Sequence, residues 1–119
     1  MSYDSQRHRL LFSTEGTVWS IPADGSTGND WSVALDSPSR PLWRFNTQYV
    51  YVGACATSAC TDGRLVELDS NAAWSTTKAL NIPQASWLGG PTIDVYASPP
   101  VLHVGSASGR VYTVAIPLP

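Results

Sequence analysis

Two cysteines are the residues of this chain best suited to covalent chemistry. Cys55 and Cys60 lie in the segment Gly53-Ala-Cys-Ala-Thr-Ser-Ala-Cys-Thr-Asp-Gly63, where a bond between them would close a short loop. A metal site would need further ligands nearby, and the two histidines lie far away in the sequence. We expect a Cys55–Cys60 disulfide, which would indicate an oxidising compartment, and keep two free thiols as the alternative.

Oxygen-bearing side chains alternate in a second segment, Asp24-Gly-Ser-Thr-Gly-Asn-Asp30. Oxygens at every second position can surround a hard cation such as Ca²⁺. No bidentate Glu follows at a suitable distance, and Asp and Ser in a Gly-rich loop commonly hydrogen-bond to their own backbone. We therefore expect a capped turn and no cofactor, with calcium at Asp24, Ser26 and Asp30 as the alternative.

Five tryptophans provide aromatic faces of the kind that line ligand pockets and stack on sugar rings. Trp43 and Trp87 lie near connections between expected strands, where side chains are freer to be exposed. Arg44 follows Trp43 directly, and its guanidinium could donate two parallel hydrogen bonds beside that ring. We predict Trp43, Arg44 and Trp87 as ligand-binding residues.

The other acid-base groups and nucleophiles form no catalytic pattern. His8 and His103 could titrate near neutral pH, but neither has a partner at a recognised spacing. His103 alternates with apolar residues, as a side chain packed in a sheet does. No Gly-x-Ser-x-Gly motif occurs. We predict no catalytic residue, and therefore not an enzyme.

Short β-strands must position all of these residues. Three segments, residues 10–21, 49–69 and 101–116, share one plan, in which two runs of β-branched and aromatic residues flank a turn. Gly16, Gly63 and Gly109 occupy the corresponding turns and are 47 and 46 positions apart. This spacing falls within the roughly 40 to 50 residues of a four-stranded propeller blade. The fold class is predicted as all-β, with about two and three-quarters propeller blades and no helix.

The strands are expected in three units that cover the single segment 1–119. The unit 3–36 has an inner strand within residues 3–9 and further strands at 9–12, 17–21 and 31–35. The unit 37–81 has strands at 42–45, 48–52, 64–68 and 74–80. The unit 82–119 has a bend at 89–93 and strands at 100–104 and 110–116, and its outer strand is missing.

The repeated segments resemble those of pyrroloquinoline-quinone-like β-propellers. The residues that carry the resemblance are Val104-Gly-Ser-Ala-Ser-Gly-Arg-Val-Tyr-Thr-Val114, Asp62-Gly-Arg-Leu-Val-Glu-Leu-Asp69 and Thr27-Gly-Asn-Asp-Trp31. The resemblance covers most of residues 9–116 and implies the fold more than an activity. It implies that Trp31 and Trp74 are packing residues. Enzymes of the family use a whole propeller with a cation and a catalytic carboxylate near its axis, and this chain is too short for that.

Composition limits the partners. Only 13% of the 119 residues are charged and the formal net charge is −2, which argues against nucleic acid. No apolar run approaches the length of a membrane span, and residues 1–9 lack the apolar core of a signal peptide.

An incomplete ring would expose its blade faces, so we expect further blades as partners, either from the same longer chain or from identical copies. We predict a non-catalytic, extracytoplasmic (periplasmic, secreted or cell-surface) module for protein interaction or assembly. A carbohydrate-binding, lectin-like oligomeric propeller and a fragment of a quinoprotein dehydrogenase are the alternatives.

Overall fold

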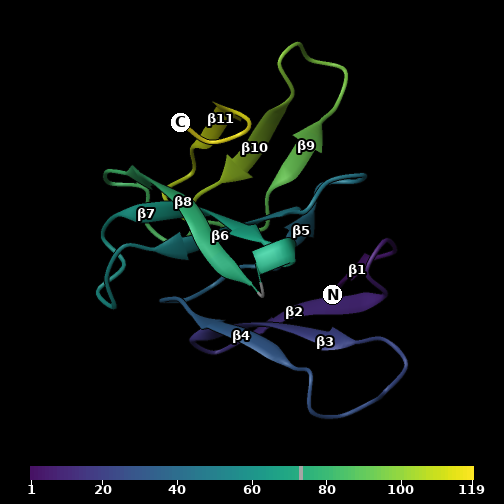
Figure 1. Cartoon of the computed structure of the whole chain (residues 1–119). Helices are drawn as coiled ribbons and strands as arrows, with labels where there is room; N and C mark the ends of the chain where they lie inside the picture. The colour runs from purple at the N-terminus through teal and green to yellow at the C-terminus, as the bar shows by residue number, and fades with distance from the viewer. Residues whose placement is uncertain (73) are drawn as a thin grey trace.

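The computed structural model describes residues 1–72 and 74–119, and the regular structure within them is almost entirely β-strand. Eleven strands form three antiparallel sheets, and each sheet is built from strands that follow one another in the chain (Figure 1). Sheet 1 contains β1 (Ser2–Asp4), β2 (Arg9–Thr14), β3 (Thr17–Pro22) and β4 (Trp31–Ala34). Sheet 2 contains β5 (Leu42–Trp43), β6 (Tyr49–Cys55), β7 (Gly63–Asp69) and β8 (Ser75–Ile82). Sheet 3 contains β9 (Thr92–Asp94), β10 (Val101–Gly105) and β11 (Val111–Ala115).

The all-β prediction is confirmed, and most expected strands are present with ends shifted by one to three residues. One short 3-10 helix, Ser70–Ala72, joins β7 to β8. The third sheet has three strands where the other two have four, as expected. The expected bend at residues 89–93 is wrong in part, because Thr92 and Ile93 belong to β9, which pairs with β10. This strand follows Pro91 and is too short to show an alternating pattern.

The three sheets stack face to face in chain order, with sheet 2 between the other two (Figure 1). In β6, Val50 and Val52 point toward sheet 1, where they pack with Leu11 and Val18. The intervening Tyr51 points toward sheet 3 and packs in a second core. Because successive side chains of a strand point to opposite faces, a strand covered on both faces has a nearly continuous apolar sequence. Tyr49-Val-Tyr-Val-Gly-Ala-Cys55 is such a sequence.

Buried polar contacts fix sheet 1 to sheet 2. The Trp74 indole is only 2% exposed, and its Nε1 donates a hydrogen bond to the Val18 carbonyl over 3.1 Å. The Ser13 hydroxyl donates to the Ser39 carbonyl over 2.6 Å in the connection between the two sheets. These contacts join residues far apart in sequence, so each of them helps to set how the two sheets are oriented.

The segment after β11 returns to the boundary between sheets 2 and 3. Ile116 and Leu118 are buried there in the same core as Tyr51. The buried Glu67 carboxylate accepts hydrogen bonds from the Tyr51 hydroxyl at 2.9 Å and from the Leu118 backbone N–H at 3.2 Å. Lys78 Nζ donates to the Leu118 carbonyl over 3.0 Å. The chain end therefore fills space that β-strands leave open between the sheets.

The prediction that Gly63 occupies a turn is wrong. Gly16 and Gly109 do lie in tight turns with φ values of 77° and 87°, in the left-handed region that favours glycine. Gly63 instead begins β7 and pairs with Cys55. A Cβ atom there would lie 2.4 Å from the Ala85 carbonyl oxygen, so this glycine permits the close approach of the connection between sheets 2 and 3.

Candidate functional site

The outer face of sheet 1 is one candidate interaction surface. Leu10, Phe12, Trp19 and Ile21 lie on the face opposite to the packed core, paired across β2 and β3. All four are half-buried, and none of them belongs to the apolar cores found among the described residues. This face is at the end of the stack (Figure 1). We call these four residues the sheet 1 end face.

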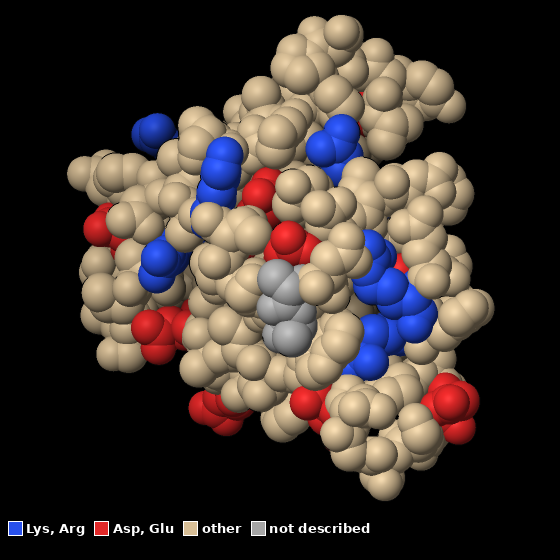
Figure 2. Space-filling model, viewed as in Figure 1, with Lys and Arg blue, Asp and Glu red and all other residues tan. Residues whose placement is uncertain are grey.

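The outer face of sheet 3 is the opposite end of the stack. It carries the small or β-branched residues Val101, Val111, Thr113 and Ala115, together with His103. His103 Nδ1 lies 3.0 Å from Oγ1 of Thr113, its partner on β11, so a cross-strand hydrogen bond joins the two side chains. We call these five residues the sheet 3 end face. Figure 2 shows that the region of sheet 3 is largely uncharged, whereas basic side chains gather beside β1 and β5.

Among the described residues, no strand pairs with the outer side of β11, which forms one edge of sheet 3. Ile116 N–H donates to the Pro100 carbonyl, and antiparallel strands alternate bonded and non-bonded pairs. The backbone groups of Val111, Thr113 and Ala115 therefore point away from β10. This edge carries no charged residue and no proline, the devices that commonly block further strand pairing.

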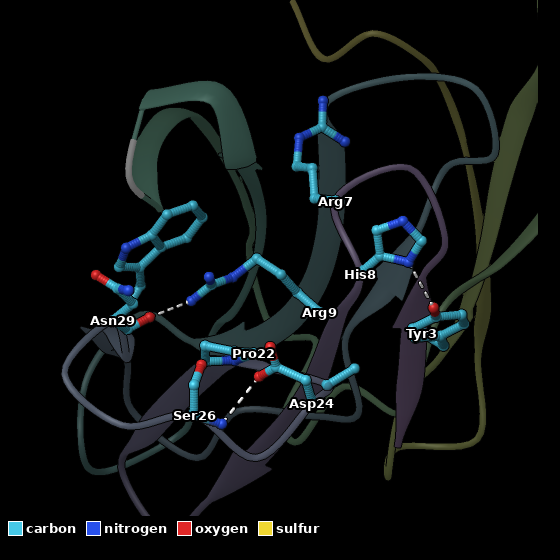
Figure 3. A pocket seen from close by; sticks show the side chains of 10 residues that line it. Tyr3, Arg7, His8, Arg9, Pro22, Asp24, Ser26 and Asn29 are labelled. Carbon is cyan, nitrogen blue, oxygen red and sulfur yellow. Dashed lines mark hydrogen bonds between the residues drawn. The ribbon is translucent and has the colours of Figure 1, made fainter.

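A pocket of about 590 Å³ lies at one end of sheet 1, between the β1–β2 turn and the β3–β4 loop (Figure 3). A backbone hydrogen bond of 2.9 Å from Ala23 N–H to the His8 carbonyl joins these two walls. Its lining includes two aromatic residues, three basic residues and one carboxylate: Tyr3, Arg7, His8, Arg9, Pro22, Ala23, Asp24, Ser26, Asn29 and Trp31. The volume is within the usual range of ligand pockets.

Arg9 is the buried cation of this pocket. Its Nε donates to Ser20 Oγ over 2.7 Å, and its Nη2 donates to the carbonyls of Ser20 and Asn29. The guanidinium lies 3.6 Å from the centre of the Trp31 ring, in a cation–π contact. Burial lowers the pKa of Arg9, and the charges of Asp30 and Asp4 oppose that shift. Arginine remains protonated at neutral pH despite such a shift.

Two further hydrogen-bond contacts shape the rest of the wall. His8 Nδ1 lies 3.1 Å from the Tyr3 hydroxyl, and Asp24 Oδ1 accepts the Ser26 backbone N–H over 2.9 Å (Figure 3). That backbone hydrogen bond is the main cause of a lowered pKa at Asp24, so its carboxyl is ionised at neutral pH. The pocket lining therefore contains both a cation, Arg9, and an anion, Asp24.

No pattern in the sequence identifies this pocket as a unit. The available signal was Arg9, which shares its face of the strand with the core residue Leu11. A charged residue at a core-facing position must find partners. Arg7 has a different role, because its guanidinium bonds Asp4, the Thr47 carbonyl and Asn71 and so bridges to sheet 2.

The three residues predicted to bind a ligand lie apart. Trp43 packs toward the core between sheets 1 and 2 and donates from Nε1 to the Thr47 carbonyl over 2.8 Å. The Arg44 guanidinium is close to Tyr51, on the other face of sheet 2, where its charge acts to lower the pKa of that phenol. Trp87 is 53% exposed, and its backbone N–H donates a hydrogen bond to Cys60 Sγ over 3.3 Å, at the opposite end of β6 from Trp43.

The loop considered for calcium has the backbone contact expected of a capped turn, in which Asp24 bonds Ser26. Ser26 and Asp30 are exposed. Within residues 1–72 and 74–119, no group of three or more His, Cys, Asp or Glu side chains is placed to hold a metal ion.

The Cys55–Cys60 disulfide is present, as predicted. Both residues are buried at the end of the β6–β7 hairpin, and Cys60 has a φ of 56°. The bond closes the loop that replaces the tight turns found at Gly16 and Gly109. It is consistent with an oxidising compartment.

Comparison with known proteins finds no matching family model, no matching curated protein and no matching solved structure. In the described part of the chain, no helix is long and apolar enough to cross a membrane.

Proposed function

We propose that this chain is a non-catalytic, extracytoplasmic assembly module, in which β-propeller-like sheets of one copy continue the stack of another. The observation that carries the proposal is the apolar end face of sheet 1, formed by Leu10, Phe12, Trp19 and Ile21. The equivalent faces inside the stack are covered by a neighbouring sheet. The resemblance to propeller repeats and the disulfide support the fold type and the compartment.

The sheet 3 end face is the best-matched partner for this surface. Sheet 1 offers the large rings of Phe12 and Trp19, whereas sheet 3 offers the small or branched side chains of Val111, Thr113 and Ala115. Large residues facing small ones are what close packing between layers requires. Sheet 1 of one copy would then pack on sheet 3 of the next, in a head-to-tail contact.

Two copies would bring six sheets together, within the roughly four to eight blades of a closed propeller. In such a ring both end faces of each copy are covered. The open edge of β11 would remain available for a fourth strand in sheet 3. The pair would bury the surface that a lone copy leaves exposed to water.

Sedimentation velocity tests the proposal on the unmodified protein and on a variant, Phe12→Lys. The unmodified chain of 12.8 kDa should sediment as a dimer, and the variant should sediment as a monomer, because a lysine in the contact must lose its hydration. Thr76→Lys is the matched control, since Thr76 is exposed on β8 of the central sheet and away from both end faces. A folded, unmodified monomer at all accessible concentrations would overturn the proposal.

A further inference from the structure

Sheet 3 lacks the outer strand that completes the other two sheets. Its last strand, β11, corresponds in position to β3 and β7, and each of those strands pairs with a neighbour on both sides. The sequence Val111-Tyr-Thr-Val-Ala115 also suits an inner strand, because it is uncharged and mainly β-branched or aromatic. In the part of the chain that the structure describes, no fourth strand follows it.

The free edge of β11 presents backbone donors and acceptors at regular intervals. The Arg110 carbonyl accepts a hydrogen bond from the chain beside it over 2.9 Å, and Ile116 N–H donates one over 3.0 Å. Bonded and non-bonded pairs alternate between these two points, so the N–H and C=O groups of Val111, Thr113 and Ala115 face away from β10. An antiparallel strand placed along this edge would satisfy all of these groups.

The outer strands of the other two sheets have features that discourage further pairing. β4 has only four residues. β8 carries Lys78, and its pairing with β7 is irregular between Glu67 and Leu68. Short length, lysine and bulges all limit the addition of another strand. β11 is regularly paired with β10 and has neither a charge nor a proline, so its edge is the most suitable of the three for strand addition.

The β11 strand of a second copy does not fit this edge. Tyr112 of β11 packs against the core that contains Ile82 of β8, so β8 lies on the β11 side of the stack. Sheet 2 has one strand more than sheet 3, and β8 therefore lies beside the position of a fourth strand. Two copies paired through β11 would bring both β8 strands into the same space. A single extended segment avoids this overlap.

We propose that β11 binds an extended segment of a partner protein as the fourth, antiparallel strand of sheet 3. The outer strand of sheet 1 shows the side-chain pattern expected of that segment, since apolar residues alternate with small ones in Trp31-Ser-Val-Ala34 and Asp36 follows. The C-terminal end of an antiparallel segment would lie beside the start of β11, where Arg110 is exposed. A carboxylate at that end would complement this charge.

Hydrogen exchange of backbone amides tests the proposal on the full chain. The probe is a synthetic peptide with the sequence of residues 30–36, acetylated and amidated at its ends. The peptide should slow exchange at the amides of Val111, Thr113 and Ala115 about tenfold when about nine-tenths of the protein is bound. The alternate amides of β11 already bond to β10 and should change less.

Thr113→Pro removes the central outward N–H and keeps the bonds between β10 and β11, because proline is tolerated where the N–H of an edge strand faces solvent. It should weaken peptide binding by about tenfold or more. Ser32→Pro is the matched control. Leu35 N–H donates to the Gly16 carbonyl, so by alternation the Ser32 N–H points away from β3, at the outer edge of sheet 1. Ser32→Pro should leave peptide binding unchanged.

Two methylated peptides show whether binding uses the backbone. One is methylated on every second backbone nitrogen from Trp31 and the other on every second nitrogen from Ser32. A strand pairs through one edge, so only one of the two should bind. No binding of the unmodified peptide, equal affinities of the methylated peptides, or equal losses in the two proline variants would overturn the proposal. Protected β11 amides before any peptide is added would also overturn it, because a second copy would then occupy the edge. Undiminished binding by Phe12→Lys would separate this edge from the assembly surface.

Discussion

Trp74 joins sheets 1 and 2, and replacing it with phenylalanine measures how much of the stability comes from that contact. Trp74→Phe removes the N–H that bonds the Val18 carbonyl and leaves space where the larger ring was. The lost hydrogen bond costs about 1 kcal/mol and the missing ring atoms about 1 kcal/mol more. The free energy of unfolding should therefore fall by about 2 kcal/mol.

Calorimetry converts this loss into a temperature. An unfolding entropy of about 2.1 cal/mol/K per residue gives ~0.25 kcal/mol/K for a chain of this length, so Tm should fall by about 8 °C. Trp87→Phe is the control, since Trp87 is 53% exposed and should cost no more than about 0.5 kcal/mol. Both variants must be compared at one protein concentration, because assembly makes Tm depend on concentration. Equal shifts in the two variants would refute the packing role of Trp74.

Three further predictions concern local features. Replacing Cys55 and Cys60 with alanine should lower the free energy of unfolding, measured with denaturant, by about 2 kcal/mol, because the disulfide closes only a short loop. An unchanged free energy of unfolding would contradict the presence of the bond. Burial and the neighbouring Glu67 raise the pKa of Tyr51, so its contribution to stability is complete below the unfolded pKa of about 10 and declines as pH rises above that value. Absorbance titration should show one phenol that ionises only as the protein unfolds, and Tyr51→Phe should remove that step. Gly63→Ala should cost about 1–3 kcal/mol through contact with backbone, whereas Gly105→Ala, where a Cβ meets nothing within 4 Å, should be nearly neutral in thermal melts.

Strand alternation and turn residues were enough to predict most of the fold. The runs around Val18, Val52 and Val104 alternate or are continuously apolar over five residues or more, and such runs identify strands well. The same patterns give the order of the sheets, because each unit is joined by short connections. The disulfide could also be predicted, since Cys55 and Cys60 are close in sequence.

The sequence was less informative where a contact between distant segments decides the structure. The role of Gly63 depends on the approach of Ala85, and no local pattern reveals that approach. The pocket forms where Arg9 of β2 and the β3–β4 loop that contains Asp24 line one cavity, and no local pattern reveals this arrangement. Trp43 and Arg44 are neighbours in the chain, but Trp43 packs in the core between sheets 1 and 2, whereas Arg44 follows the end of β5 and lies close to Tyr51 on the other face of sheet 2.

A mixing experiment tests the central claim, that the end face of sheet 1 packs on the end face of sheet 3 of another copy. Phe12→Lys blocks the first face and Thr113→Lys blocks the second. Native mass spectrometry should find each variant monomeric alone and a one-to-one complex in the mixture, because the mixture retains one intact contact. A Thr113→Lys variant that still dimerises alone, or a mixture that stays monomeric while the unmodified chain assembles, would contradict the account.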